Sequence, residues 1–154
     1  MLKRTGGNDG GRTEGTEGRP GESRQGMHGV VRVLVIDDDA DIRRLLCDIL
    51  TSAGHLVADA SNGAEGIEIF KKEAFDMVLT DLEMPEMSGW EVARSIKNHN
   101  PDITIALITG WGETIDSAQL RESGISTIVN KPFRMDQIIN LAREVQAGML
   151  SGQR

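Results

Sequence analysis

Five residues with chemically capable side chains occupy equivalent places in this sequence. Each stands at, or just after, the end of a short apolar run rich in β-branched residues. If these runs are strands of one parallel sheet, their carboxyl ends meet at a single edge, which is where open α/β sheets bind ligands. The five residues are Asp37, Asp38, Asp81, Thr109 and Lys131.

The types of these side chains indicate a particular chemistry. Three carboxylates brought together repel one another and favour a cation, and oxygen ligands without His or Cys favour Mg²⁺ over zinc or iron. The Lys131 ammonium and the Thr109 hydroxyl can both donate to an anionic group, and a phosphoryl group fits between them and the metal. Asp81 is then the nucleophile, whose attack forms an acyl phosphate. The competing interpretation of Asp81 is that it only caps a turn.

The elements that must position these residues follow from the hydrophobic pattern. Strands are predicted at residues 30–36, 56–60, 75–80, 103–108 and 127–129, and a helical pattern follows each of them. Connections of this length exclude hairpins and imply right-handed crossovers, so the sequence predicts an α/β fold with a parallel sheet covered on both faces. A flavodoxin-like, doubly wound sheet in the order 2-1-3-4-5, with five helices, would bring all five side chains to one crevice.

Apolar residues at three- and four-residue spacing predict the inward faces of the helices. The segment 113–123 has only a thin apolar stripe, which predicts a mobile helix. The predicted inward residues are Ile42, Leu45, Leu46, Ile49, Leu50 and Ala53 in the first helix, Ala64, Ile67 and Phe70 in the second, Trp90, Ala93 and Ile96 in the third, and Met135, Ile138, Ile139, Ala142 and Val145 in the last.

Composition bounds the domain organisation. The first segment, residues 1–28, is rich in glycine and charge, which predicts a disordered tail. We expect one folded domain over residues 29–148 and a short C-terminal tail over 149–154. Met27 is an alternative start of the chain. A net charge of −7 argues against nucleic acid as a partner. Because the sequence contains neither a signal peptide nor a membrane span, we expect a cytoplasmic protein without a membrane partner.

Several residues have a more ordinary interpretation. Asp39 and Asp41 stand where a helix begins, so we expect them to cap it rather than to bind metal. The two histidines of the connecting segments, His55 and His99, have no partner at metal spacing and are predicted on the surface. The single cysteine, Cys47, fits a helical core position.

Four segments together carry a resemblance to a known family. VLVIDDDADIRRLL, VLTDLEMPEMSG, LITG and IVNKPF, in this order, closely resemble the receiver domain of two-component response regulators over residues 30–147. The resemblance implies that Asp81 is the phosphoacceptor, Asp37 and Asp38 the acidic pair of the metal site, Thr109 the switch hydroxyl and Lys131 the phosphate contact.

The resemblance also implies that Glu83 lends its backbone carbonyl to the metal ion, and that the peptide bond before Pro132 is cis. The chain departs from the family at two places: Ile128 stands where an aromatic switch residue is usual, and Arg134 where the last helix usually has a small polar cap. Glu83 and Trp111 are expected to edge the crevice.

The function predicted from these observations is that of a stand-alone response regulator. A histidine kinase or phosphotransfer protein donates the phosphoryl group to Asp81 in the presence of Mg²⁺, and a downstream protein recognises the modified state. The chain is then no enzyme beyond its own phosphorylation and dephosphorylation. The family also allows a homodimer through the fourth helix, fifth strand and fifth helix.

Two alternatives remain open at this stage. A haloacid-dehalogenase-type phosphatase would use Asp37 as its nucleophile, since the triplet Asp37-Asp38-Asp39 contains an acid-x-acid pattern after the first strand. That family expects Thr or Val where Asp41 stands, and a later acidic motif that is not found here. The other alternative is an interaction module that binds its target independently of phosphorylation.

Overall fold

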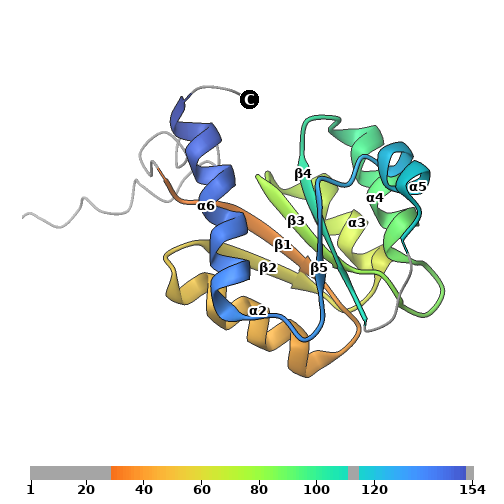
Figure 1. Ribbon diagram of the computed structural model, residues 1–154, viewed down its shortest axis with the longest axis horizontal. Coiled ribbons are helices and arrows are strands. Elements are labelled where there is room, and N and C mark those ends of the chain that lie inside the picture. Colours follow the sequence, from red (N-terminus) through yellow and green to blue (C-terminus); the bar gives the residue numbers. More distant parts are fainter. Residues whose placement is uncertain (1–28, 111–114, 152–154) are drawn as a thin grey trace, which may run out of the picture.

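The fold is built around one parallel sheet, seen in a computed structural model that describes residues 29–110 and 115–151 (Figure 1). The strands lie in the order β2-β1-β3-β4-β5, and all neighbouring pairs are parallel. They are β1 (Arg32–Ile36), β2 (Leu56–Ala60), β3 (Met77–Asp81), β4 (Thr104–Thr109) and β5 (Thr127–Asn130). The predicted fold class and strand order are confirmed.

The described residues form five helices, which cover both faces of the sheet. Figure 1 shows α2 and α6 on one face and α3, α4 and α5 on the other. These helices are α2 (Ala40–Ser52), α3 (Gly63–Lys72), α4 (Gly89–His99), α5 (Ser117–Ser123) and α6 (Met135–Ser151). Among them, none is long and apolar enough to cross a membrane.

The central strand β1 is apolar on both sides because side chains alternate between the two faces of a sheet. Val33 and Val35 pack in the cluster that includes α2 and α6, while Leu34 and Ile36 pack in the cluster that includes α3 and α4. All four side chains are fully buried. Because β1 is packed on both faces, it holds the acidic triplet that begins with Asp37 in a fixed place at the edge of the sheet.

Four predicted inward residues lie outside the core. Leu45 is 45% exposed, Met135 is 60% exposed, and Ala53 and Ala64 are exposed as well. The apolar spacing was correct for each helix, but Leu45 stands at the margin of the buried stripe, Ala53 is the C-cap of its helix, and the other two lie in a first turn. Half-buried Cys47 packs against the core on the α2 side, as predicted, and burial raises the pKa of its thiol to about 11.

The last helix differs from the prediction at both ends. Its predicted N-terminus lacked a cap, but the Gln137 side chain reaches back and accepts a hydrogen bond from the backbone N–H of Arg134 at 2.7 Å. This is half of a capping box, made by the residue in the third helical position. At the other end α6 continues to Ser151 and so includes three residues assigned to the tail.

The prediction of a surface position for His55 is wrong. His55 is 6% exposed, and its Nδ1 accepts a hydrogen bond from the backbone N–H of Val31 at 3.1 Å. Gly54, with φ of 95°, turns the chain back from α2 so that this imidazole lies against the start of β1. Because burial disfavours the imidazolium, the pKa of His55 is lowered.

We expect His55 to make the protein less stable in acid. The unfolded chain takes up a proton near pH 6.5, whereas the folded protein resists it, so the free energy of unfolding should fall as pH drops below 6.5 toward the lower folded pKa. Urea unfolding at pH 7.5 and pH 5 should show a smaller acid loss in His55→Gln than in wild type. The exposed His99→Gln serves as the control, and equal acid losses in wild type and His55→Gln would contradict this role.

Candidate active site at the carboxyl edge of the sheet

The strand order brings together residues that are far apart in the chain. Asp37 follows β1, and Asp81 is the last residue of the neighbouring strand β3, with Ile36 and Thr80 paired in register. Asp81 in turn pairs with Ile108 on β4. The two acids are therefore neighbours at the switch point of the sheet, where the chain leaves in opposite directions.

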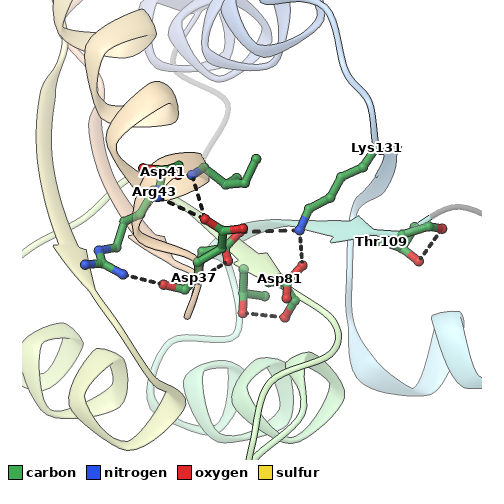
Figure 2. A network of polar contacts seen from close by, with 10 residues as sticks. Asp37, Asp41, Arg43, Asp81, Thr109 and Lys131 are labelled. Carbon is green, nitrogen blue, oxygen red and sulfur yellow. Dashed lines mark hydrogen bonds and ion pairs between the residues drawn. The ribbon is translucent and has the colours of Figure 1, made fainter.

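Lys131 points into this edge from the loop after β5 (Figure 2). Its Nζ donates to Oδ1 of Asp81 at 2.9 Å and lies 3.7 Å from Oδ2 of Asp37. Its backbone N–H donates to the carbonyl oxygen of Thr109 at 2.8 Å, and the peptide bond to Pro132 is cis, as the family resemblance implied. One ammonium group thus contacts both acids.

The electrostatics of the site result from burial of like charges. Burial raises the pKa of Asp37 to about 6, a backbone hydrogen bond from Asp39 opposes this, and the charge of Asp81 adds to it. Burial also raises the pKa of Asp81, although Lys131 opposes the rise. For Lys131 burial favours the neutral amine, but the hydrogen bond to Asp81 and the attraction of both acids outweigh it and raise the pKa. The lysine is therefore a cation at neutral pH.

The three acids fit a divalent cation. One carboxylate oxygen each from Asp37, Asp38 and Asp81 lies within 4.8 Å of the others. Among the described residues, Asp37 Oδ2 is the only buried side-chain N or O atom without a hydrogen bond. This buried oxygen, whose cationic neighbour Lys131 is too distant for a hydrogen bond, lies next to two more carboxylates and matches the hard oxygen ligands that Mg²⁺ takes. Glu83 has an exposed side chain outside this cluster, and the role of its backbone carbonyl stays a prediction.

Thr109 lies at the same edge but does not contact the acids. It is buried at the end of β4, and its hydroxyl donates over a long 3.5 Å to the carbonyl of Gly110. Figure 2 shows this hydroxyl apart from the contact between Lys131 and Asp81. The structure therefore brings four of the five predicted side chains together and leaves the fifth turned aside. Trp111 lies outside the described residues.

The loop after Asp81 is held close to the strand end. Ser88 and Glu91 form a capping box that starts α4, and the Gly89 N–H donates to the carbonyl of Leu82 at 2.8 Å. A Cβ on Gly89 would lie 2.5 Å from the carbonyl oxygen of Asp81, so only glycine permits this approach. The loop between β3 and α4 therefore packs closely against Asp81.

Before α2, the last residue of the acidic triplet caps the helix, as predicted for Asp39. Asp39 is the N-cap, and its side chain accepts from the backbone N–H groups of Asp41 and Ile42. Its own N–H donates to Oδ1 of Asp37 at 2.9 Å. Sequence reasoning missed Arg43, which donates to the carbonyl oxygen of Asp37; an arginine in an early helical turn gives no signal of such a contact.

Comparison with known proteins decides the family. The family model described as the response regulator receiver domain matches residues 33–143. The chain belongs to this family. The phosphatase alternative would place its nucleophile at Asp37, directly after β1, whereas Asp81 is the last residue of β3.

Individual relatives agree with this assignment. The receiver domain is 36% identical over 109 residues to the response regulator receiver protein CpdR of Brucella abortus, covering 71% of this chain and 91% of that protein. It is 33% identical over 115 residues to the chemotaxis protein CheY of Thermotoga maritima, covering 74% of this chain and 96% of that protein. It spans only 46% of a longer relative, the probable transcriptional regulator ycf27 of Porphyra purpurea.

A solved structure agrees as well. A receiver domain protein from Clostridium thermocellum superposes with a TM-score of 0.72 at 28% identity, covering 77% of this chain and 95% of that one.

The departure from the family that the sequence showed in β5 concerns a core position. Ile128, which replaces the usual aromatic, is half-buried and packs against the core on the α3 and α4 side. An aliphatic side chain here cannot perform an aromatic rotamer change.

Proposed function

We propose that this receiver domain accepts a phosphoryl group on Asp81 from the phosphohistidine of a histidine kinase or phosphotransfer protein. The observation that carries the proposal is the ammonium group of Lys131, which contacts Asp81 at 2.9 Å and faces Asp37 at 3.7 Å. A cation so placed can neutralise charge on a group attached to Asp81. Phosphorylation-dependent binding of a downstream protein is the proposed output, and a cytoplasmic location stays a prediction from sequence.

The proposed transfer is a displacement at phosphorus. A carboxylate oxygen of Asp81 attacks the phosphoryl group of the partner's phosphohistidine, the O–P bond forms, and the P–N bond breaks as the imidazole leaves with its electron pair. Lys131 holds Oδ1 of Asp81, which leaves Oδ2 as the attacking atom. Asp37 and Asp38 would hold Mg²⁺ together with Asp81 and the Glu83 carbonyl. When bound, this ion supplies positive charge that offsets the charge of the acids and of the phosphoryl oxygens.

The output would depend on Thr109 and on the elements beside it. Its hydroxyl can form a hydrogen bond with a phosphoryl group only by turning from Gly110 toward Asp81. The adjacent helix α5 spans only seven residues and buries only Ser123 fully. Such an element can shift at small cost, and a coupling of ~1–3 kcal/mol changes partner affinity about 5- to 150-fold. A homodimer through α5, β5 and α6 is a prediction of the same kind.

The experiment that tests this function uses the whole chain and a small acyl phosphate as donor. With MgCl₂ present, intact mass spectrometry should show one added phosphoryl group, and chelation of Mg²⁺ with EDTA should prevent its addition. The phosphatase alternative predicts steady turnover of a phosphate monoester, and the interaction module predicts no uptake at all. No uptake with Mg²⁺ present would contradict the proposal.

A further inference from the structure

Arg43 joins helix α2 to the ends of two strands. Its Nη1 donates to the carbonyl oxygen of Asp37 at 2.8 Å, and its Nε donates to Oδ2 of Asp59 in β2 at 2.9 Å. Figure 2 shows Arg43 beside Asp37, on the side away from Lys131. From these contacts we propose that Arg43 is a positioning residue that aims the carboxylates of Asp37 and Asp38 at the metal. This inference rests on the proposed function, because it assumes that the acids bind Mg²⁺.

The contact acts on the peptide group between the two acids. The carbonyl of Asp37 and the N–H of Asp38 lie in one rigid plane, so a bond to the carbonyl oxygen fixes that plane. On the other side of the residue, the Asp37 N–H donates to the carbonyl of Ala60 at 3.2 Å. The backbone of Asp37 is thus held from both sides by groups that belong to α2 and β2.

Asp38 depends on this support more than Asp37 does. Asp37 is fully buried and its Oδ1 is held by the N–H of Asp39, whereas Asp38 is exposed. Since packing does not fix the Asp38 side chain, its direction follows from the backbone that carries it. Without Arg43 the peptide plane could rotate, and the Asp38 carboxylate would spend less time near the other two acids.

Positioning and simple charge predict opposite effects on metal binding. Arg43 is a cation that contacts the backbone of one of the acids, Asp37, so its positive charge alone repels Mg²⁺, and removing the charge would tighten binding. If Arg43 positions the acids, removing it weakens binding despite the more negative field. Groups that orient metal ligands contribute about 10- to 100-fold to metal affinity, which exceeds the effect of one charge that is already paired with Asp59.

The test is a calorimetric titration of the unphosphorylated full-length chain with MgCl₂ alone. We expect Arg43→Gln to raise the Kd for Mg²⁺ about tenfold. Arg44→Gln makes the same charge change on an exposed neighbour in α2 and should leave the Kd unchanged or lower it. Asp59→Ala removes only the second contact of Arg43 and should weaken binding less than Arg43→Gln does.

The outcomes separate this inference from the proposed function. Wild type that fails to bind Mg²⁺ contradicts the proposed function itself. Wild type that binds, together with a folded Arg43→Gln whose Kd is equal or lower, overturns the positioning role. If circular dichroism shows that Arg43→Gln is unfolded, Arg43→Met decides: its long apolar side chain can pack like the stem of the arginine but donates no hydrogen bond to the Asp37 carbonyl, so a Kd equal to that of wild type would overturn the inference.

Discussion

Replacing Asp81 by asparagine is expected to abolish phosphoryl uptake from a small acyl phosphate in the presence of Mg²⁺. The amide has the shape of the carboxylate but is no nucleophile toward phosphorus, so the O–P bond cannot form. The substitution should not unfold the protein, because burial and the nearby acids already raise the pKa of Asp81 and make its charge unfavourable. Intact mass spectra of Asp81→Asn should therefore show only the unmodified chain.

A matched control is available on α2. Asp48→Asn makes the same chemical change at an exposed position away from the edge of the sheet, and it should take up phosphoryl groups as wild type does. Thermal unfolding of both variants would show that neither result is due to loss of the fold. Undiminished uptake by Asp81→Asn would remove Asp81 from its role.

The second large effect is expected for Asp37→Asn, which should lose Mg²⁺ binding and yet be more stable without the metal. Asp37 is fully buried, and its pKa is about 6 in the folded protein against an ordinary value of 3.8. The folded state therefore disfavours the ionised form, at a cost of up to about 3 kcal/mol above pH 6. The raised pKa already includes the attraction to Lys131. Because asparagine carries no charge, it avoids this cost, and since an amide fills the hydrogen bonds of this buried position less well, we expect a net gain of about 1–2 kcal/mol.

The pH dependence of this gain has a definite sign. Below pH 3.8 the acid is protonated in both states and the variant gains nothing from neutrality. As pH rises toward 6 the unfolded chain ionises while folded Asp37 resists, so wild type loses stability relative to Asp37→Asn, and the difference is constant at higher pH. Urea unfolding in EDTA from pH 4 to pH 8 measures it, and a difference that shrinks with rising pH would contradict this account.

Addition of MgCl₂ should reverse the order of the two proteins. Binding to the folded state alone raises the unfolding temperature of wild type, whereas Asp37→Asn should show little response. The same variant separates the proposed receiver function from the phosphatase alternative. A phosphatase with Asp37 as nucleophile would lose turnover of a phosphate monoester in Asp37→Asn but keep it in Asp81→Asn. Mg²⁺-dependent stabilisation of Asp37→Asn equal to that of wild type would exclude Asp37 as a ligand.

Much of the fold could be predicted because its pattern is local. The run that ends at Ile36 is apolar at every position but one, which is typical of a strand buried on both faces, and β1 lies at the centre of the sheet. The site followed from the same pattern, since each strand delivers its last residues to one edge. The contact of Lys131 with Asp81 links residues 50 positions apart, and their meeting at one edge followed from the strand order that the sequence analysis assumed.

The errors concern properties that local pattern does not contain. His55 is polar and follows a glycine, which favours a surface loop, but the turn at Gly54 places it under β1. Arg43 looks like a solvated helix residue until β2 brings Asp59 beside it. The direction of the Thr109 hydroxyl is a choice among rotamers of similar energy, and sequence does not select one.

The central claim, that Asp81 becomes the acyl phosphate, is tested most directly by mapping the modified residue in wild type. The chain is phosphorylated with a small acyl phosphate and MgCl₂, reduced with borohydride, which converts an aspartyl phosphate to homoserine, and analysed by peptide tandem mass spectrometry. We predict homoserine at position 81 and at no other aspartate. Homoserine at position 37 instead, or none at position 81, would contradict the account.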